Sequence, residues 1–596
     1  MSPSRRALLV LPALLLIGCP VEIPIPVDPP EARLDYAQTP LDTPVTLAPL
    51  LNDYDPNAEL LSVVSIGTPS HGVATLNPGG TIDYTPDTGY LGGDSFEVTI
   101  TDASGNQASN RAHVTIGSSA RTVYRSNYTD YFTNQLYMSD SAHPQTMVPV
   151  SVRIPITQGP QLSRQQVTAY IPSADGVNLI YTADTNPSFS LVDLYHADLR
   201  QPGVGTKLTT IDDGQAIGGL SLPQIAPDNL HAYYLSNEFN PALFEVVQVE
   251  IANPTNQVRV NTPLDTDDII ERFSLSLDGA YMLYVARDAD ATPTLAENKL
   301  HVVDLTNPGV STVISGTATS GTLGVAGSLG ALGFRFIPGT TKVVYAAQAN
   351  GATTIDLYVV DYIAMTPPQK LSGTALGTGV INYGFTPDGS RVLYVSAEDV
   401  ATVLDLYMVD PNVPGVPTRL SKLRTGTANI STFSVGMDNT FALYVRDDDV
   451  ADQRELYFVE FANPTVQVKL NHALRPGTTL TAPEVVLGIR VSPGAPRVVL
   501  YSTTDELGTD GIFHQTMRTV DVDAVGTTNI VGPSTYTGHS YGWMADGDTI
   551  IYQDSPPETV QATSLYHVRI SAPTVYTRLS NEDHGGDAAI EFSFLP

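Results

Sequence analysis

Short runs of alternating apolar and polar residues recur along most of the chain, and turns rich in Gly, Pro, Asn and Asp separate them. Residues 170–184 (YIPSADGVNLIYTAD) show the pattern: a first run, a turn built around Asp-Gly, and a second run rich in Leu, Ile and Tyr. A period of two with frequent turn residues predicts β-strands joined by tight turns. The sequence therefore predicts an all-β protein of many short strands.

This two-strand unit repeats from residue 118 to the end of the chain. The other copies are at 225–238, 273–288, 334–348, 383–399, 433–449, 489–505 and 541–554. A second half follows, as in DLYVVDY (356–362) or DLYMVDP (405–411), and then a short run such as TRLS (418–421). Four strands in about 50 residues are typical of one propeller blade. The unit resembles the WD40-like repeats of TolB-type β-propellers, which implies a ring of such blades.

Two incomplete units lie at the ends of this region. Residues 121–124 and 135–140 match later strands of a blade with no inner strand before them, whereas 590–596 match an inner strand with nothing after it. Pairing them would build one blade from both ends, close the ring and satisfy the free strand groups of these two segments. We therefore expect a closed propeller over 118–596, with nine blades by repeat count, or eight if one degenerate unit only flanks the ring.

Residues 32–117 carry a different β pattern. Runs rich in β-formers at 61–66, 73–76, 81–84 and 95–100 alternate with Gly, Pro and Asn clusters, which is typical of a small β-sandwich. The stretch NDYDPN and the later SHGVATLNPGGTIDYTPDTGYLGGDSFEVTITDASGN resemble bacterial cadherin-like, Ig-like domains of surface proteins. That resemblance implies an Ig-like fold.

The N-terminus has the features of an export signal. Arg5 and Arg6 precede an apolar run, 7–17, that is too short to span a membrane. The run ends in Leu-Ile-Gly-Cys, which resembles a bacterial lipobox. The resemblance implies that 1–18 are a signal peptide and that Cys19, the only cysteine, is lipidated and anchors the protein to a membrane. Pro rather than Asp at position 20 favours the outer membrane by the same resemblance. Residues 19–31 are rich in Pro and predict an extended tether.

Charge narrows the choice of partners. The chain has 62 acidic and 30 basic residues, a formal net charge of −32. Such a charge argues against binding to nucleic acid or to anionic lipid head groups, and it permits divalent cations.

One acidic cluster is a candidate calcium site. Asn52, Asp53 and Asp55 place oxygen-bearing side chains close together, and Asp102 is a candidate fourth ligand. Ca²⁺ prefers six to eight oxygen ligands, and cadherin-like relatives often bind it in this region. Alternatively, these residues are turn formers that bond their own backbone. Both interpretations stay open at this point.

The stretch Gly-His-Ser-Tyr-Gly at 538–542 fits the G-x-S-x-G motif of serine hydrolases. That motif requires a strand-to-helix turn in an α/β sheet. Here 541–547 align with 383–389, the inner strand of another blade, so Ser540 precedes a propeller strand. We therefore interpret the motif as a chance match and expect that Ser540 is not catalytic.

Taken together, these features predict a lipid-anchored protein of the bacterial cell envelope, on the periplasmic or surface face. Its propeller would be a non-catalytic scaffold or protein-binding module, because TolB-like relatives engage other envelope proteins. The alternative is an envelope enzyme of the lyase or glycosidase type, with paired carboxylates in the propeller channel.

Overall fold

The protein is described by a computed structural model. It covers residues 28–119, 121–126, 135–151, 166–184, 192–209, 221–240, 242–265, 268–288, 297–315, 333–348, 354–422, 429–447, 453–474, 484–494, 497–507, 513–524, 528–532, 541–544, 546–554, 564–578 and 591–595. Within these ranges the chain is all-β, and its one helix is the short 3₁₀ turn η1 (Pro49–Leu51). No helix in this part of the chain has the length and apolar character needed to cross a bilayer.

Residues 35–116 fold into two packed sheets. The first has the order β1 (Asp35–Thr39), β7 (Gln107–Ile116), β6 (Gly92–Thr101), β3 (Ser62–Ile66), and β1 runs parallel to β7. The second has the order β2 (Val45–Leu47), β5 (Ile82–Pro86), β4 (Gly72–Leu76). Alternate residues of β5 are buried, as its sequence pattern predicts. Tyr84 and Phe96 pack in the core between the sheets.

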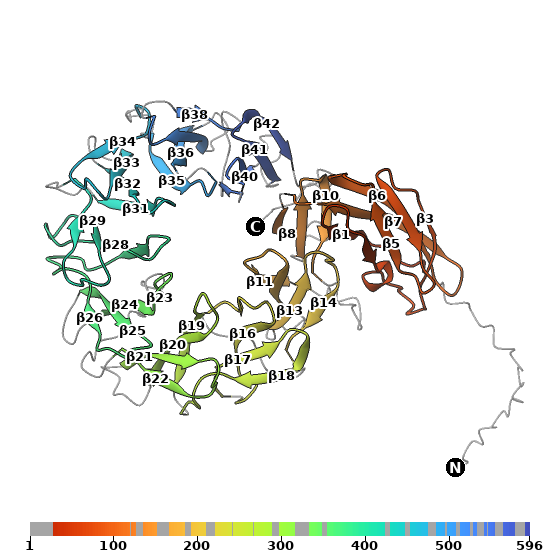
Figure 1. Ribbon diagram of the computed structural model, residues 1–596, viewed down its shortest axis with the longest axis horizontal. Coiled ribbons are helices and arrows are strands. Elements are labelled where there is room, and N and C mark those ends of the chain that lie inside the picture. Colours follow the sequence, from red (N-terminus) through yellow and green to blue (C-terminus); the bar gives the residue numbers. More distant parts are fainter. Residues whose placement is uncertain are drawn as a thin grey trace, which may run out of the picture.

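Nine four-stranded sheets follow, arranged as the blades of a ring (Figure 1). We number the blades along the chain. Their strands are, in blade 1, β10 (His143–Pro149), β9 (Gln135–Asp140), β8 (Arg121–Ser126) and β43 (Glu591–Leu595); in blade 2, β11 (Gln166–Pro172), β12 (Asn178–Asp184), β13 (Val192–Asp198) and β14 (Gly205–Lys207); in blade 3, β15 (Gln224–Ile225), β16 (His231–Ser236), β17 (Glu245–Glu250) and β18 (Asn253–Arg259); in blade 4, β19 (Ile269–Leu275), β20 (Tyr281–Asp288), β21 (Glu297–Asp304) and β22 (Ser311–Val313); in blade 5, β23 (Phe334–Phe336), β24 (Lys342–Gln348), β25 (Ile355–Asp361) and β26 (Gln369–Lys370); in blade 6, β27 (Asn382–Phe385), β28 (Val392–Ser396), β29 (Asp405–Val409) and β30 (Thr418–Arg419); in blade 7, β31 (Ile430–Val435), β32 (Phe441–Asp447), β33 (Arg454–Glu460) and β34 (Gln467–Lys469); in blade 8, β35 (Val486–Val491), β36 (Val498–Leu507), β37 (Phe513–Asp521) and β38 (Thr528–Ile530); and in blade 9, β39 (Tyr541–Trp543), β40 (Thr549–Asp554), β41 (Ser564–Arg569) and β42 (Ala572–Arg578).

Blade 1 is assembled from the two ends of the propeller region. The inner strand β43 pairs antiparallel with β8, with Phe592 opposite Tyr124 and Phe594 opposite Thr122. Each blade is an open sheet, so the ring forms by side-by-side packing of blades and by this one pairing of distant segments. The all-β prediction of a sandwich followed by a propeller is confirmed, and the described strands form nine blades rather than eight.

Tyrosines connect the blades. In most blades a Tyr of the second strand stacks on a Tyr of the third, as in Tyr394–Tyr407, with ring centroids 5.5 Å apart. Tyr394 is fully buried, and its hydroxyl accepts a hydrogen bond from the Gly373 amide, which follows the outer strand of the preceding blade. The Leu-Tyr repeat in the sequence therefore marks side chains that pack between neighbouring blades.

Candidate functional site: the junction between the two domains

The two domains meet through buried polar groups rather than through apolar surface alone. The Tyr36 hydroxyl on β1 donates a hydrogen bond to Asp140 Oδ2 at 2.6 Å, and the Thr115 hydroxyl on β7 donates to the same oxygen at 2.7 Å. Asp140 ends β9 on the propeller side and is 1% exposed. A buried carboxylate is stable only with such partners. Hydroxyls of the Ig-like domain thus satisfy a carboxylate of blade 1.

Burial, followed by the negative charge of Asp140, raises the pKa of the Tyr36 phenol. Tyr36 therefore keeps its proton at neutral pH and remains the donor in this hydrogen bond. The backbone amide of Ala142 donates to the other carboxylate oxygen of Asp140 at 2.8 Å. Asp140 consequently ties the β9–β10 turn to the Ig-like domain.

A histidine pair forms a second contact of the junction. Nδ1 of His113 on β7 lies 3.0 Å from Nδ1 of His143 on β10, and the rings meet edge to face. His143 Nε2 lies 3.1 Å from the Val114 carbonyl oxygen. A carbonyl can only accept, so His143 Nε2 carries the hydrogen and its Nδ1 accepts from His113 Nδ1–H. This chain of donors and acceptors requires a neutral His143, because its Nδ1 must accept.

Burial is the main reason why both rings are neutral. Each histidine is 8% exposed. Desolvation, with a smaller contribution from His143, lowers the pKa of His113 to about 4, and desolvation also lowers the pKa of His143. Both rings therefore bind their extra proton only in acid.

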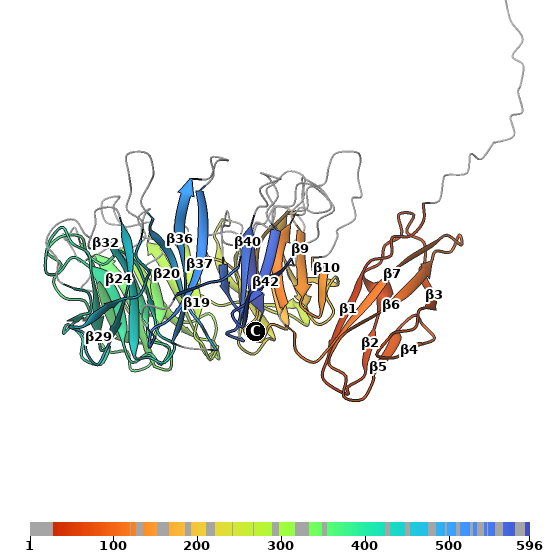
Figure 2. The same ribbon diagram turned by 90° about the horizontal axis from the view of Figure 1, so that it is seen from above.

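Close backbone packing completes the contact. A Cβ atom added to Gly93 would overlap the Ala142 carbonyl oxygen and the His143 ring. The turn between β13 and β14 of blade 2 also takes part, because the Gln38 amide donates to the Arg200 carbonyl at 3.3 Å and Gln201 Nε2 donates to the Thr46 carbonyl at 3.0 Å. β7 ends at Ile116 and β8 begins at Arg121, so the connection is short. Figure 2 shows the Ig-like domain beside the ring, next to β10.

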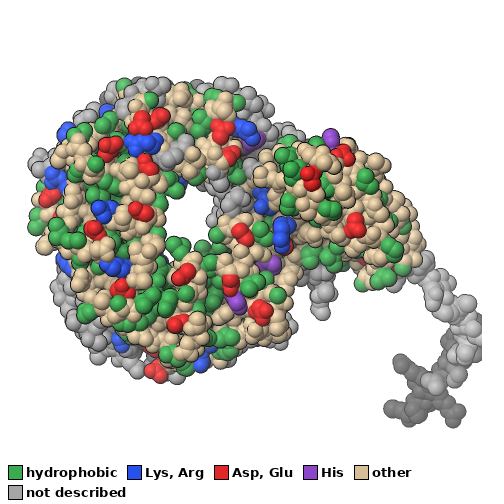
Figure 3. Space-filling view, in the orientation of Figure 1, with side chains coloured by type: hydrophobic (Ala, Val, Ile, Leu, Met, Phe, Trp, Pro, Cys, Tyr) green, Lys and Arg blue, Asp and Glu red, His purple; other side chains and the backbone are tan. Residues whose placement is uncertain are grey.

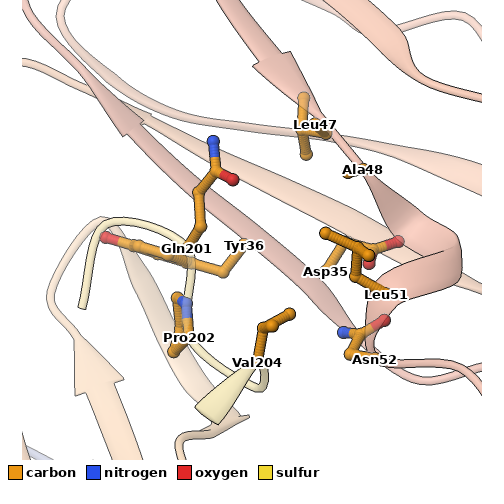
Figure 4. A pocket seen from close by; sticks show the side chains of 9 residues that line it. All are labelled: Asp35, Tyr36, Leu47, Ala48, Leu51, Asn52, Gln201, Pro202 and Val204. Carbon is orange, nitrogen blue, oxygen red and sulfur yellow. The ribbon is translucent and has the colours of Figure 1, made fainter. Parts of the chain in front are cut away.

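A small pocket opens beside this junction (Figure 4). It is lined by Asp35, Tyr36, Leu47, Ala48, Leu51, Asn52, Gln201, Pro202 and Val204. The space open to the centre of a water molecule is about 20 Å³, which is room for water but not for an organic ligand. Burial, and then the charge of Asp53, raise the pKa of Asp35 to about 8, against the opposing hydrogen bond of Asn52. Asp35 therefore carries a proton at neutral pH.

The residues predicted as a calcium site are all described, and each has backbone partners nearby. Asp53 accepts from the Arg33 amide at 2.7 Å, and Asp55 accepts from the amides of Asn57 and Glu59 at 2.8 and 2.9 Å. Asp102 accepts from the backbone and side-chain nitrogens of Asn106, both at 2.8 Å. The structure brings Asn52 and Asp53 close to Asp35, whereas Asp55 and Asp102 each cap their own turn.

Across the described ranges, no group of three or more His, Cys, Asp or Glu could hold a metal ion. Of the two interpretations of the Asn and Asp residues, the turn-forming one matches these hydrogen bonds. Calcium binding stays a prediction.

Acidic residues at the start of the third strand in several blades also have structural partners. Asp193 accepts from the Thr209 hydroxyl at 2.7 Å and pairs with Lys207 at 3.2 Å. Asp356 pairs with Lys370 in the same way, at 2.9 Å. The acidic residue of the Asp-Leu-Tyr repeat thus joins the third strand to the fourth.

The inner strands that face the channel carry more basic than acidic side chains in the described part. Arg335 lies over the Tyr383 ring at 5.2 Å and donates to the Tyr383 carbonyl. Glu271 is the acidic side chain described on an inner strand, and the charges nearest to it belong to Arg287 and Arg272. Figure 3 shows the open centre of the ring.

The remaining predicted residues lie elsewhere. Cys19, residues 1–18 and Ser540 fall outside the described residues. The strand that follows Ser540, β39, pairs with β40 as the inner strand of blade 9, with Trp543 opposite Ile550. The interpretation of Ser540 as non-catalytic depends on this placement of β39.

Sequence reasoning did not identify the junction. Tyr36 and Asp140 are 104 residues apart, and His113 and His143 are 30 apart. No local spacing links residues at such separations. The alternation of side chains along a strand even predicts that His113, between Ala112 and Val114, points away from the core that these two residues join.

Comparison with known proteins supports this description of the first domain. A family model described as a bacterial Ig domain matches residues 27–116. No curated protein matches the chain. The class defined so far is thus a bacterial Ig domain joined to a β-propeller.

Several solved structures share part of the arrangement. A eukaryotic initiation factor has 11% identity and a TM-score of 0.48, over 80% of this chain and 99% of that one. Dipeptidyl peptidase 4 of Porphyromonas gingivalis has 13% identity and a TM-score of 0.44, over 64% and 61% of the two chains. Oligogalacturonate lyase of Vibrio parahaemolyticus has 16% identity and a TM-score of 0.35, over 59% and 88%. Likenesses at this level assign no activity to the chain.

Proposed function

We propose that this protein is a lipid-anchored scaffold of the bacterial envelope, held by Cys19, whose propeller binds another envelope protein and performs no catalysis. The tether and the Ig domain would hold the ring away from an outer-membrane surface. The buried junction supports this proposal because it fixes the orientation of the ring relative to the anchored domain. A fixed orientation serves a module that presents a surface to a partner.

The observation that carries the proposal is a ring of exposed apolar side chains. The turns between the first and second strands of the blades place an apolar residue at their second position. It is exposed in six of the blades, as Ala174, Pro227, Leu277, Pro387, Met437 and Pro493, and half-buried in blade 5, as Pro338. Leu277 is 72% exposed and Met437 is 45% exposed. Repeated exposed apolar groups on one face are typical of a protein-binding surface.

These turns also contact one another around the ring. Asn229 Nδ2 donates to Asp175 Oδ2 at 2.7 Å between blades 3 and 2, and the Asp388 amide donates to Asn439 Oδ1 at 3.0 Å between blades 6 and 7. We call this band, residues 173–176, 226–229, 276–279, 386–389, 436–439 and 492–494, the turn collar. Within each of these two pairs of blades, the neighbouring turns form one edge on which a partner could lie.

The turn collar is acidic as well as apolar. The Ser276 hydroxyl lowers the pKa of Asp278, and the Thr386 side chain lowers the pKa of Asp388, so both are ionised at neutral pH. In Figure 3, acidic and hydrophobic side chains lie around the ring on the face shown. The partner that fits such a surface has basic and apolar side chains together.

The enzymatic alternative requires two carboxylates that face each other in the channel. Among the described carboxyl groups, burial raises the pKa of Asp35 to about 8 and that of Asp53 to about 6, and both residues belong to the Ig domain. Near Glu271 the other charges are arginines. These placements support a binding module over a channel enzyme.

Affinity capture from cell envelopes with a matched pair of variants tests the proposal. Leu277→Glu with Met437→Glu adds charge to the turn collar, and Leu60→Glu adds charge to an 85% exposed position of the Ig domain. We expect a reproducible partner to bind the wild type and the Leu60 variant but not the collar variant. Capture that the collar variant retains, or the same absence of partner in all three, would contradict the proposal.

A further inference from the structure

The histidine pair lies where a single proton would change the junction. His113 belongs to the Ig domain and His143 to the propeller, and their Nδ1 atoms are 3.0 Å apart. With both rings neutral, one Nδ1 donates and the other accepts. A proton on His143 Nδ1 would place two N–H groups against each other, and a proton on His113 Nε2 would bury a charge.

The surrounding charges do not fully offset the free-energy cost of protonating the histidine pair. Asp140 and Asp94 favour a proton on His143, and Asp140 favours one on His113, whereas Arg111 on β7 disfavours it. The buried oxygen of Asp140 is already occupied by the hydroxyls of Tyr36 and Thr115. Arg121 on β8 lies near Tyr36 and donates to the carbonyls of blade 2. The first proton is therefore only partly compensated, and a second adds repulsion between two like charges.

We propose that the His113–His143 contact is a pH-sensitive latch: it holds the Ig domain against the propeller at neutral pH, and protonation of the pair in acid releases the domain about Gly117. Gly117 is suited to such a hinge because it lies between the two domains and has a φ of +88°. The contacts that would separate are those of β1 and β7 with the β9–β10 turn, and those of Gln38 and Thr46 with the β13–β14 turn. Both domains keep their own sheets.

Distances between spin labels test the latch in the full chain with Cys19→Ser. One label is placed at Val73→Cys, which is 62% exposed on the Ig domain, and the other at Ala252→Cys on the surface of blade 3. Double electron–electron resonance is recorded from pH 7.5 to pH 3.5. We expect one narrow distance at pH 7.5 and a broad, longer distribution at pH 3.5. A distribution unchanged over this range would overturn the proposal.

Two controls separate the latch from general acid effects. Labels at Ala252→Cys and Val416→Cys, both in the propeller, should keep a narrow distance at pH 3.5; broadening there would mean that the ring itself opens. The variant His113→Asn with His143→Gln keeps a donor towards the Val114 carbonyl and an acceptor towards residue 113, but it cannot be protonated. It should remain narrow at pH 3.5, and broadening equal to that of the wild type would assign the change to carboxylates instead.

Gly93→Ala provides an independent test, because the added methyl group overlaps the propeller turn and opens the junction without changing a titratable group. In this variant the distance should already be broad at pH 7.5. The two histidine resonances should titrate close to the ordinary histidine value, as measured by NMR. The Gly93→Ala result decides the question if the His113→Asn, His143→Gln variant is already broad at pH 7.5. Histidine pKa values that stay as depressed in Gly93→Ala as in the wild type would overturn the latch.

Discussion

The hydrogen bonds to Asp140 give the sharpest prediction for stability. Tyr36→Phe combined with Thr115→Val removes both hydroxyls that donate to Asp140 Oδ2, at 2.6 and 2.7 Å, while it preserves nearly all the packed volume. The carboxylate is 1% exposed, so water cannot replace these donors without opening the junction. The Ala142 amide alone then remains, on Oδ1.

The expected loss of unfolding free energy follows from the negative charge of the acceptor, Asp140. A hydrogen bond to a charged buried group contributes about 1.5–3 kcal/mol, so each single variant should lose about that much, and the double variant at most about 3–6 kcal/mol, the sum of the two losses. Because the two donors share one acceptor, the losses need not add. Against a typical unfolding free energy of about 5–15 kcal/mol this is a large effect.

Urea unfolding at pH 7 measures this cost, with separate observation of the Ig domain and the propeller. Tyr90→Phe is the matched control, because the Tyr90 hydroxyl donates to the neutral Gly93 carbonyl at 2.9 Å and is only half-buried. It should cost about 0.5–1.5 kcal/mol. If Tyr36→Phe costs no more than Tyr90→Phe, Asp140 does not depend on the Ig domain and the description of the junction is wrong.

Three further predictions concern buried charge and the anchor. Arg446 of blade 7 and Asp405 of blade 6 are both fully buried and form an ion pair at 2.9 Å. Arg446→Met should lower the unfolding free energy by about 3–5 kcal/mol, because it leaves the Asp405 charge unpaired, whereas Arg446→Met with Asp405→Leu should restore most of that loss. Equal losses in the two variants would refute the importance of pairing these charges. The folded-state pKa of Asp35, about 8, exceeds its usual 3.8, so the folded protein binds the proton more tightly and loses stability as pH rises from about 4 to 8. Asp35→Asn should therefore gain stability over the wild type between pH 6 and pH 9 in thermal unfolding, and a difference independent of pH would count against the burial argument. Cys19→Ala should abolish incorporation of radiolabelled palmitate and release the protein from membranes, and a membrane-bound variant would contradict lipid anchoring.

The sequence predicts the blades well because the strands of most blades are consecutive in the chain. The four strands of such a blade follow one another within one repeat, and the turn residues Asp278-Gly279 or Asp388-Gly389 mark the same place in each. Closure was predictable for a related reason: the fragment at 590–596 had an inner-strand pattern with no blade of its own, and β8 lacked an inner strand.

The junction was not predictable, because its contacts join segments that the repeat does not relate. The hydroxyls of Tyr36 and Thr115 look like ordinary strand residues until the β9–β10 turn is placed against them. The same holds for Asp35, whose pKa is raised chiefly by burial and which lines a pocket together with Gln201 of blade 2. The pattern of Asn52, Asp53 and Asp55 suggests calcium in the sequence, whereas in the structure Asp53 and Asp55 accept hydrogen bonds from backbone amides.

Closure of the ring by the two ends of the propeller is the claim on which this account depends, and a disulfide tests it directly. Val123 lies opposite Ser593 in the antiparallel pair of β8 and β43, and opposed residues in such a pair are about 4.5–5.5 Å apart between Cβ atoms, within reach of a disulfide. In a Cys19→Ser background, Val123→Cys with Ser593→Cys should oxidise within one molecule and raise the unfolding free energy by about 2–4 kcal/mol, whereas Val123→Cys with Ser571→Cys should keep both thiols free. Free thiols at 123 and 593 in the folded monomer, or disulfides only between molecules, would contradict the closed nine-bladed ring.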